Sequence, residues 1–147
     1  MPSKPNISQK PKVPTGPFDL MGQKADISLC ETRDSSGNPK SIFVVNESFN
    51  VHLDLEYPEV LADVKAAYTV RLICIQLAPS FGAGPYSTVF TGNLDVNTTN
   101  LSLDFPFTAS DPGMGPGIYF VLATLDFGSA SQFAAYCLGN VFFVAYP

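Results

Sequence analysis

Charge is scarce in this chain of 147 residues, and most of it lies in the first half. Charged side chains make up 14% of the sequence and the formal net charge is −5, whereas typical domains carry about 25% charged residues. No basic residue follows Arg71. An acidic body disfavours nucleic-acid binding, which relies on Lys and Arg at the phosphates. So little surface charge also favours self-association.

Histidine, cysteine and tryptophan are rare as well. His52 is the only histidine, tryptophan is absent, and the three cysteines form no C-x-x-C motif. This composition excludes most zinc sites, which need Cys and His at close spacing. We expect Cys30, Cys74 and Cys137 to act as small apolar residues in or near strands, mostly unpaired. One disulfide between two of them stays open as an alternative.

Catalytic signatures are missing too. The chain has no G-x-S-x-G elbow, no H-E-x-x-H pair, no Walker A loop and no dinucleotide fingerprint. His52 is the only candidate imidazole base, but it alternates with Asp54 and Glu56 on the polar side of an expected strand, which predicts a solvated surface residue. Three oxygen-bearing residues offer calcium ligands without matching an EF-hand loop: Asp95, Asn97 and Asp104. We therefore expect no enzyme, and no catalytic, cofactor or metal site.

The C-terminal segment is long, apolar and almost without charge. Asp126 is the only charged residue from position 112 to the C-terminus, so a membrane helix of about 20 residues has to be considered. Polar residues and glycines interrupt the run, and its apolar residues are largely aromatic or β-branched, which is typical of strands. We predict two strands and no membrane span: residues 117–127, and residues 132–145 with an interruption at Gly139 and Asn140.

The N-terminal stretch is rich in proline and lysine. Residues 1–17 hold five prolines and three lysines with no acidic residue, so we expect an extended segment that forms no core. Its lack of an apolar stretch predicts no signal peptide and synthesis in the cytoplasm, with the final compartment left open. A solvated terminus is one interpretation. The other is an arm that docks on a neighbouring subunit or scaffold through charged and apolar side chains: Lys4, Ile7, Lys10, Lys12, Val13 and Phe18.

After residue 17 the pattern changes to the two-residue period of strands. FNVHLDLEY alternates strictly, which places five apolar residues on one face: Phe49, Val51, Leu53, Leu55 and Tyr57. LSLDFPF alternates in the same way, and Pro106 marks an edge or a bulge. Further strands are predicted at residues 25–32, 41–45, 68–77 and 86–90. Eight side chains are expected in the core: Val51, Leu53, Leu55, Leu72, Leu103, Phe105, Phe120 and Leu122.

One stretch, YPEVLADVKAA, is typical of a short helix. Pro58 would take the first helical position, with Val60, Leu61 and Val64 on one face. No alternation of strands with helices and no fixed repeat is found. The sequence therefore predicts a single domain over residues 18–147, folded as an antiparallel all-β sandwich of seven to nine strands.

The stretch PGMGPGIYFVLATLDFG resembles the penultimate strand of many bacterial immunoglobulin-like domains. The resemblance implies an immunoglobulin-like sandwich, with a jelly roll as the alternative, and it implies nothing about function. The chain departs from the family pattern in having no tryptophan and in the placement of Cys30 relative to Cys137.

The segment IYFVLATL within that stretch is apolar on both faces, whereas the outer face of a sandwich strand should be polar. We expect the arm, a loop or a second subunit to cover it. The chain is interpreted as a non-enzymatic assembly protein, such as a coat, decoration, filament or surface component, that docks on itself or another protein through its arm and apolar sheet face. A small carbohydrate- or protein-binding module that uses exposed Tyr and Phe is the alternative.

Overall fold

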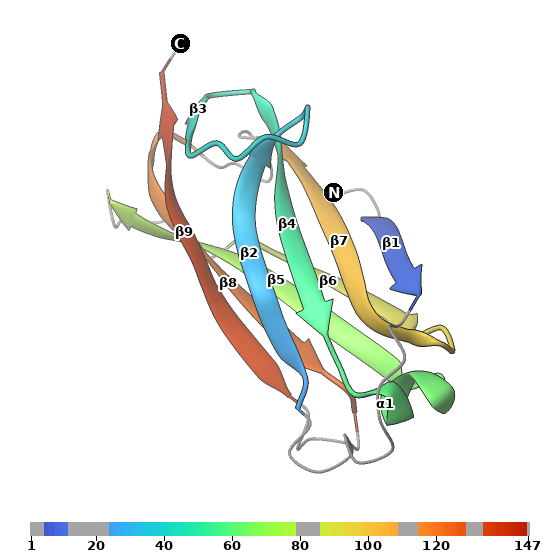
Figure 1. Ribbon diagram of the computed structural model, residues 1–147. Coiled ribbons are helices and arrows are strands. Elements are labelled where there is room, and N and C mark those ends of the chain that lie inside the picture. The colour runs from blue at the N-terminus through green and yellow to red at the C-terminus, as the bar shows by residue number, and fades with distance from the viewer. Residues whose placement is uncertain (1–4, 12–23, 79–85, 109–114, 129–133, 147) are drawn as a thin grey trace.

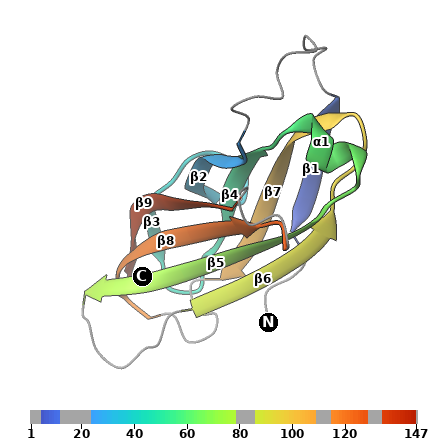
Figure 2. The same ribbon diagram turned by 90° about the horizontal axis from the view of Figure 1, so that it is seen from below.

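The computed structural model describes residues 5–11, 24–78, 86–108, 115–128 and 134–146. These residues form two β-sheets packed face to face, with one short helix at an end of the sandwich (Figure 1, Figure 2). The predicted all-β, immunoglobulin-like sandwich is confirmed.

One sheet has the strand order β1-β7-β4-β2, and all of its pairs are antiparallel. Its strands are β1 (Asn6–Pro11), β7 (Thr98–Thr108), β4 (Ser48–Glu56) and β2 (Asp26–Asp34). In the β4–β7 ladder Leu53 lies opposite Leu103 and Val51 lies opposite Phe105. This register brings the apolar sets of the two alternating sequences to the same face of the sheet.

The other sheet has the order β3-β9-β8-β5-β6. Its strands are β3 (Ile42–Val44), β9 (Ala135–Ala145), β8 (Gly117–Asp126), β5 (Ala67–Ala78) and β6 (Tyr86–Asn93). Among these described strands, only β3 and β9 pair in parallel. β9 lies beside β2 of the first sheet, so the two sheets meet along one side of the sandwich (Figure 1, Figure 2).

The core lies between the sheets and is rich in aromatic rings. Phe49 of β4 stacks on Phe43 of β3 and on Phe107 of β7, with ring centroids 4.5 and 5.6 Å apart. Tyr119 of β8 stacks on Phe142 of β9 at 5.4 Å. Because such pairs contribute beyond the area that they bury, this cluster holds strands of both sheets together.

The prediction for β8 placed the wrong face in the core. Tyr119 and Val121 are fully buried, whereas Phe120 and Leu122 lie on the outer face and are half-buried. Both sets are apolar, so alternation alone does not decide which one points inward. Tyr119 can face inward because its hydroxyl donates to the Gly115 carbonyl at 2.6 Å. The other six predicted core residues are buried.

The interruption predicted in the last strand is a β-bulge. β9 continues through it, and the register with β8 shifts so that Gly139 and Asn140 together lie opposite Val121. A Cβ on residue 139 would lie 2.9 Å from Cys30 Sγ. The close approach of β2 to this point therefore requires glycine.

The helix α1 (Glu59–Asp63) confirms the predicted helical stretch but not its details. Pro58 is the N-cap, with extended backbone, and not the first helical residue. Leu61 and Ala62 are buried, whereas Val60 and Val64 are 45% and 68% exposed. A five-residue helix buries adjacent positions of a single turn, so the predicted stripe of Val60, Leu61 and Val64 is wrong.

The prediction that residues 1–17 form an arm outside the domain is wrong for Asn6–Pro11. This segment is β1, an edge strand antiparallel to β7, with Ile7 opposite Leu103. Pairing satisfies backbone N–H and C=O groups that an extended arm would leave to water. The sandwich therefore begins before residue 18, and the rest of the predicted arm lies outside the described residues apart from Pro5.

Candidate functional site

The outer face of the β3-β9-β8-β5-β6 sheet is the first candidate for a functional surface. Strand register places nine apolar residues on it in three cross-strand rows: Ile73, Leu122 and Leu138; Ile75, Phe120 and Val141; and Ile118, Phe143 and Ile42. These nine residues are named the apolar face. They come from four strands and correspond to the apolar sheet face expected from the sequence.

Several side chains of the apolar face are open to solvent. Within the described part of the chain, Leu138 and Ile42 are 63% and 62% exposed, and Val141 and Phe143 are 44% and 42% exposed. The remaining members are half-buried. Exposed apolar surface of this continuity marks an interaction site more often than a bare monomer surface.

The bulge in β9 is what keeps this face apolar across its full length. Leu138, before the bulge, and Val141, after it, both point outward, although they differ by an odd number of positions. If the same sequence continued as a regular strand without the bulge, the alternation would instead turn Asn140 and Phe142 outward. The bulge therefore switches the alternation of β9 so that Phe142 stays in the core and Phe143 joins the apolar face.

Charge is confined to one end of this surface. Among the described residues of the five strands, Arg71 and Asp126 carry the only charges. They line a hollow of about 320 Å³ together with Thr69, Thr124, Leu125, Ala134, Ala135 and Tyr136. Tyr136 is 73% exposed, so an open aromatic ring stands beside this hollow.

His52, on the outer face of the other sheet, is not the solvated residue that the sequence predicts. It is 8% exposed, with ring Nδ1 2.7 Å from Asp104 Oδ1 and Nε2 2.9 Å from Asp54 Oδ1. Ser102 Oγ donates to the same Asp54 oxygen at 2.6 Å. Each of the two ring nitrogens thus faces a carboxylate oxygen of a neighbouring residue. With both nitrogens occupied, His52 has no nitrogen left to act as a base.

The electrostatics of this cluster favour ionised Asp54. Burial by itself raises the pKa of Asp54, but the hydrogen bond from Ser102 and the neighbouring His52 ring outweigh it and hold the pKa below its ordinary value. Charge and hydrogen bonds are thus satisfied within the cluster, which is the pattern of a structural element.

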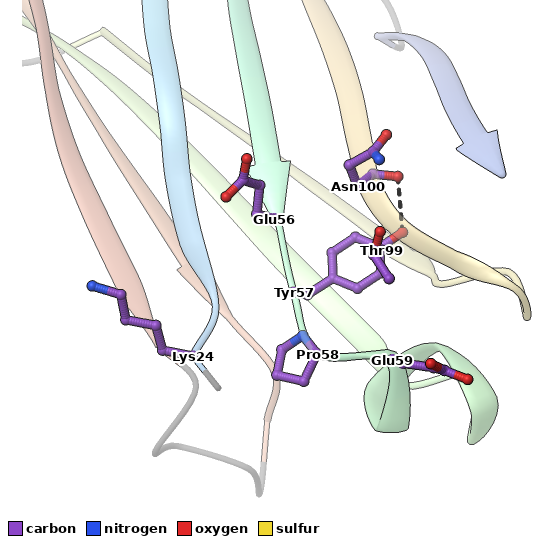
Figure 3. Close-up of a pocket in the computed structure, with 7 residues that line it drawn as sticks. All are labelled: Lys24, Glu56, Tyr57, Pro58, Glu59, Thr99 and Asn100. Carbon is purple, nitrogen blue, oxygen red and sulfur yellow. Dashed lines mark hydrogen bonds between the residues drawn. The ribbon is translucent and has the colours of Figure 1, made fainter. Parts of the chain in front are cut away.

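A hollow at the end of the sandwich near α1 is the other concave site considered. It measures about 290 Å³ and is lined by Lys24, Glu56, Tyr57, Pro58, Glu59, Thr99 and Asn100 (Figure 3). The Lys24 amine and the Glu59 carboxylate point to opposite sides in this view. The Tyr57 hydroxyl is already bonded to Thr98 Oγ1 at 2.7 Å and to the Asn100 carbonyl at 3.0 Å. The charged groups do not converge on one point, so the hollow offers no assembled reaction centre.

The residues considered for calcium are not brought together. Asp104 joins the His52 cluster, whereas Asp95 and Asn97 lie in the turn before β7. Thr98, where β7 begins, lies six positions from Asp104, which is about 20 Å along a strand. In the described ranges no three His, Cys, Asp or Glu side chains form a group that could hold a metal ion. None of the helices described there has the length and apolar character needed to span a membrane.

Two of the six predicted partner-binding residues, Ile7 and Lys10, lie in the described part of the chain. Lys4, Lys12, Val13 and Phe18 lie outside the described residues. Ile7 is in β1 and 50% exposed, and Lys10 is in the same strand. Their contact with a partner stays a prediction.

Sequence reasoning missed the contact between His52 and Asp104. The signal is present in the two alternating segments, because both residues sit on the polar side of their strands. Only the β4–β7 register, which places them directly opposite one another, turns that signal into a contact.

No protein-family model and no curated protein matches this chain. Solved structures of similar fold do exist. An alkylpurine DNA glycosylase, AlkC, from Pseudomonas fluorescens bound to DNA with an abasic site analogue matches with a TM-score of 0.50 and 15% identity, over 86% of this chain and 32% of that one. A β-glucosidase from Listeria innocua matches with a TM-score of 0.51 and 12% identity, over 84% of this chain and 16% of that one.

This chain therefore spans about a third of the length of the glycosylase and about a sixth of that of the glucosidase. The major subunit of aggregative adherence fimbriae type I from Escherichia coli is also among the similar structures, with a TM-score of 0.37 and 8% identity, over 84% of this chain and 96% of that one. The glycosylase and the glucosidase are proteins of different kinds and are less than 25% identical to this chain, so these likenesses show the fold alone.

Proposed function

We propose that this protein is a non-enzymatic assembly subunit that associates with further copies of itself through the apolar face. The observation that carries the proposal is the continuous set of nine apolar side chains on four strands, with its most exposed members, Leu138 and Ile42, open to solvent. A sheet in a lone sandwich gains nothing from apolar residues on its outer side, because water contacts them there.

The size of the apolar face supports a protein contact. Each of the nine side chains takes about 4.8 Å across the strands and about 6.8 Å along them, so together they cover roughly 300 Å². A standard interface buries about 800 Å² on each partner. The apolar face thus supplies roughly a third of a stable contact, and neighbouring exposed residues such as Tyr136 and Val44 extend it.

A second copy is the partner that the surface fits best. Apolar sheet faces stack on one another about 10 Å apart, as the two inner faces of a sandwich do. The apolar face carries no charge that would repel its own copy, and the whole chain is poor in charge. A two-fold axis would therefore make this surface self-complementary.

The test is the mass of the protein in solution, measured by sedimentation over a range of concentrations. Leu138→Asp puts a charge into the middle of the contact, and it should lower the mass at every concentration. Val64→Asp is the matched control, because Val64 is 68% exposed but lies at the end of α1, and it should leave the mass unchanged. Equal masses for the wild type and Leu138→Asp would rule out the proposal.

Carbohydrate binding is the second candidate, favoured by the exposed Tyr136 ring beside the 320 Å³ hollow. If the protein binds carbohydrate, it should be a monomer at all concentrations and should bind immobilised glycans. Tyr136→Ala should then abolish the binding. Concentration-dependent assembly without glycan binding favours the assembly subunit.

A further inference from the structure

The four strands at the ends of the two sheets differ in how their open edges are protected. β1 contains Lys10 and Pro11 and has an irregular register there. β2 has four charged residues and a register shift, and β3 is only three residues long. Charges, proline, bulges and shortness are the means by which native sheets prevent pairing with another chain.

β6 has none of these protections. Its sequence, YSTVFTGN, has no charge and no proline, and it pairs with β5 over eight residues without a register shift. No described strand pairs with its other edge. On the outer side of the sheet, Val89 is 49% exposed. β6 therefore presents a long, regular and uncharged edge.

We infer that β6 pairs antiparallel with β6 of a second copy of this chain. A two-fold axis perpendicular to the sheet makes two identical strands antiparallel, and each edge then offers alternating donors and acceptors to the other. Residues that lie directly opposite one another in such a pair point to the same face of the sheet. The axis must therefore pass through a single residue position, and not between two neighbouring residues. With the axis at Val89, that residue lies opposite its own copy and Ser87 lies opposite Thr91, a favourable pair of hydroxyl residues.

This contact deepens the assembly proposed above by adding a second surface to the apolar face. A perpendicular two-fold axis leaves the outer faces of both copies on the same side, so the two apolar faces become parts of one sheet surface. The doubled surface reduces the shortfall of a single apolar face against a standard interface. Two different contacts on one chain also allow assemblies larger than a dimer.

The experiment separates the two surfaces by working in the Leu138→Asp chain, where only the β6 contact remains. We expect this chain to sediment as a dimer. Val89→Lys and Val89→Glu, each added singly, place like charges opposite one another across the axis and should give monomers. An equimolar mixture of the two should recover the dimer, because unlike charges then face each other. Val60→Lys in the helix α1 is the matched control, since Val60 is 45% exposed and Val89 is 49% exposed, and it should leave the dimer intact.

The outcomes distinguish the two ideas. Dimers that persist in both Val89 variants, or that are lost in Val60→Lys instead, overturn the β6 contact. A mixture that stays monomeric overturns the axis at Val89. If Leu138→Asp sediments like the wild type, the proposed contact through the apolar face is wrong. The Val89 variants still test the contact through β6 in that case. Far-UV circular dichroism and the thermal midpoint of each variant confirm that the fold is kept.

Discussion

Asn140 in β9 binds Thr32 in β2 through both ends of its amide. Its Oδ1 accepts the Thr32 N–H at 2.8 Å, and its Nδ2 donates to Thr32 Oγ1 at 2.8 Å. Thr32 is 1% exposed, and the two residues belong to different sheets. The bulge that places Asn140 here therefore ties the sheets together where β2 and β9 lie side by side (Figure 1).

Asn140→Ala should lower the free energy of unfolding by about 1–3 kcal/mol, because it leaves the buried Thr32 N–H without an acceptor. Urea denaturation measures the change. Asn93→Ala is the control: the Asn93 side chain donates to the Lys65 carbonyl in an exposed bond of 3.0 Å, and losing it should cost less. If both variants lose the same free energy of unfolding, the hydrogen bonds between Asn140 and Thr32 contribute no more to stability than an exposed hydrogen bond.

Asp54 should make part of the stability sensitive to acid. Its folded pKa is lower than its ordinary value of 3.8, so ionised Asp54 stabilises the fold above that pH. This contribution is lost as the pH falls through the lower, folded pKa. Ser102→Ala removes the hydrogen bond to the Asp54 carboxylate, so the pKa of Asp54 in the folded protein moves closer to its pKa in the unfolded protein. The fall in stability between neutral pH and about pH 3 should therefore be smaller in this variant.

Urea midpoints at the two pH values test this prediction. Ser28→Ala is the matched control, because Ser28 Oγ donates to the backbone carbonyl of Asp54, at 3.3 Å, and not to its carboxylate. Its acid dependence should equal that of the wild type. An unchanged acid dependence in Ser102→Ala would show that the Ser102 bond does not set the titration of Asp54.

The three thiols, all free in the structure, should react at different rates. Burial raises the pKa of Cys30 to about 12, with a smaller effect of nearby Cys137, and burial raises the pKa of Cys74 to about 12. Cys137 is only partly buried. Since the thiolate is the reactive form, a disulfide reagent at about pH 8 should modify Cys137 first, and Cys137→Ser should remove that fast phase. Titration of unfolded, unreduced protein should find all three thiols; a single thiol would reveal a native disulfide.

The sequence predicts the orientation of a strand well only where its two faces differ. In β4 one set of alternating residues is apolar and the other is polar, so the buried face of Phe49 and Leu53 could be predicted. In β8 both sets are apolar, and the choice between Tyr119 and Phe120 depends on pairing with β5 and β9. The apolar face itself could be foreseen from that same lack of polar residues.

Long-range pairing accounts for the other errors. The burial of His52 follows from a strand partner 52 positions away, which alternation along one segment does not reveal. In residues 6–11, lysine and proline favour an extended arm when only the sequence is considered, yet both residue types are also common in edge strands. Composition could not separate these two structures, and the pairing of β1 with β7 does.

The position of β9 has a consequence for how the protein is made. Thr32 is hydrogen-bonded to Asn140, which lies 108 residues later in the chain. β3 pairs in parallel with β9, the strand that contains Asn140. A chain that emerges slowly from the ribosome cannot close this side of the sandwich until β9 has been synthesised. Until then Phe43 and Cys30, buried in the finished domain, lack their covering strand. Folding is therefore completed after translation of the last strand, and the nascent chain is most open to aggregation and to chaperone binding just before that step.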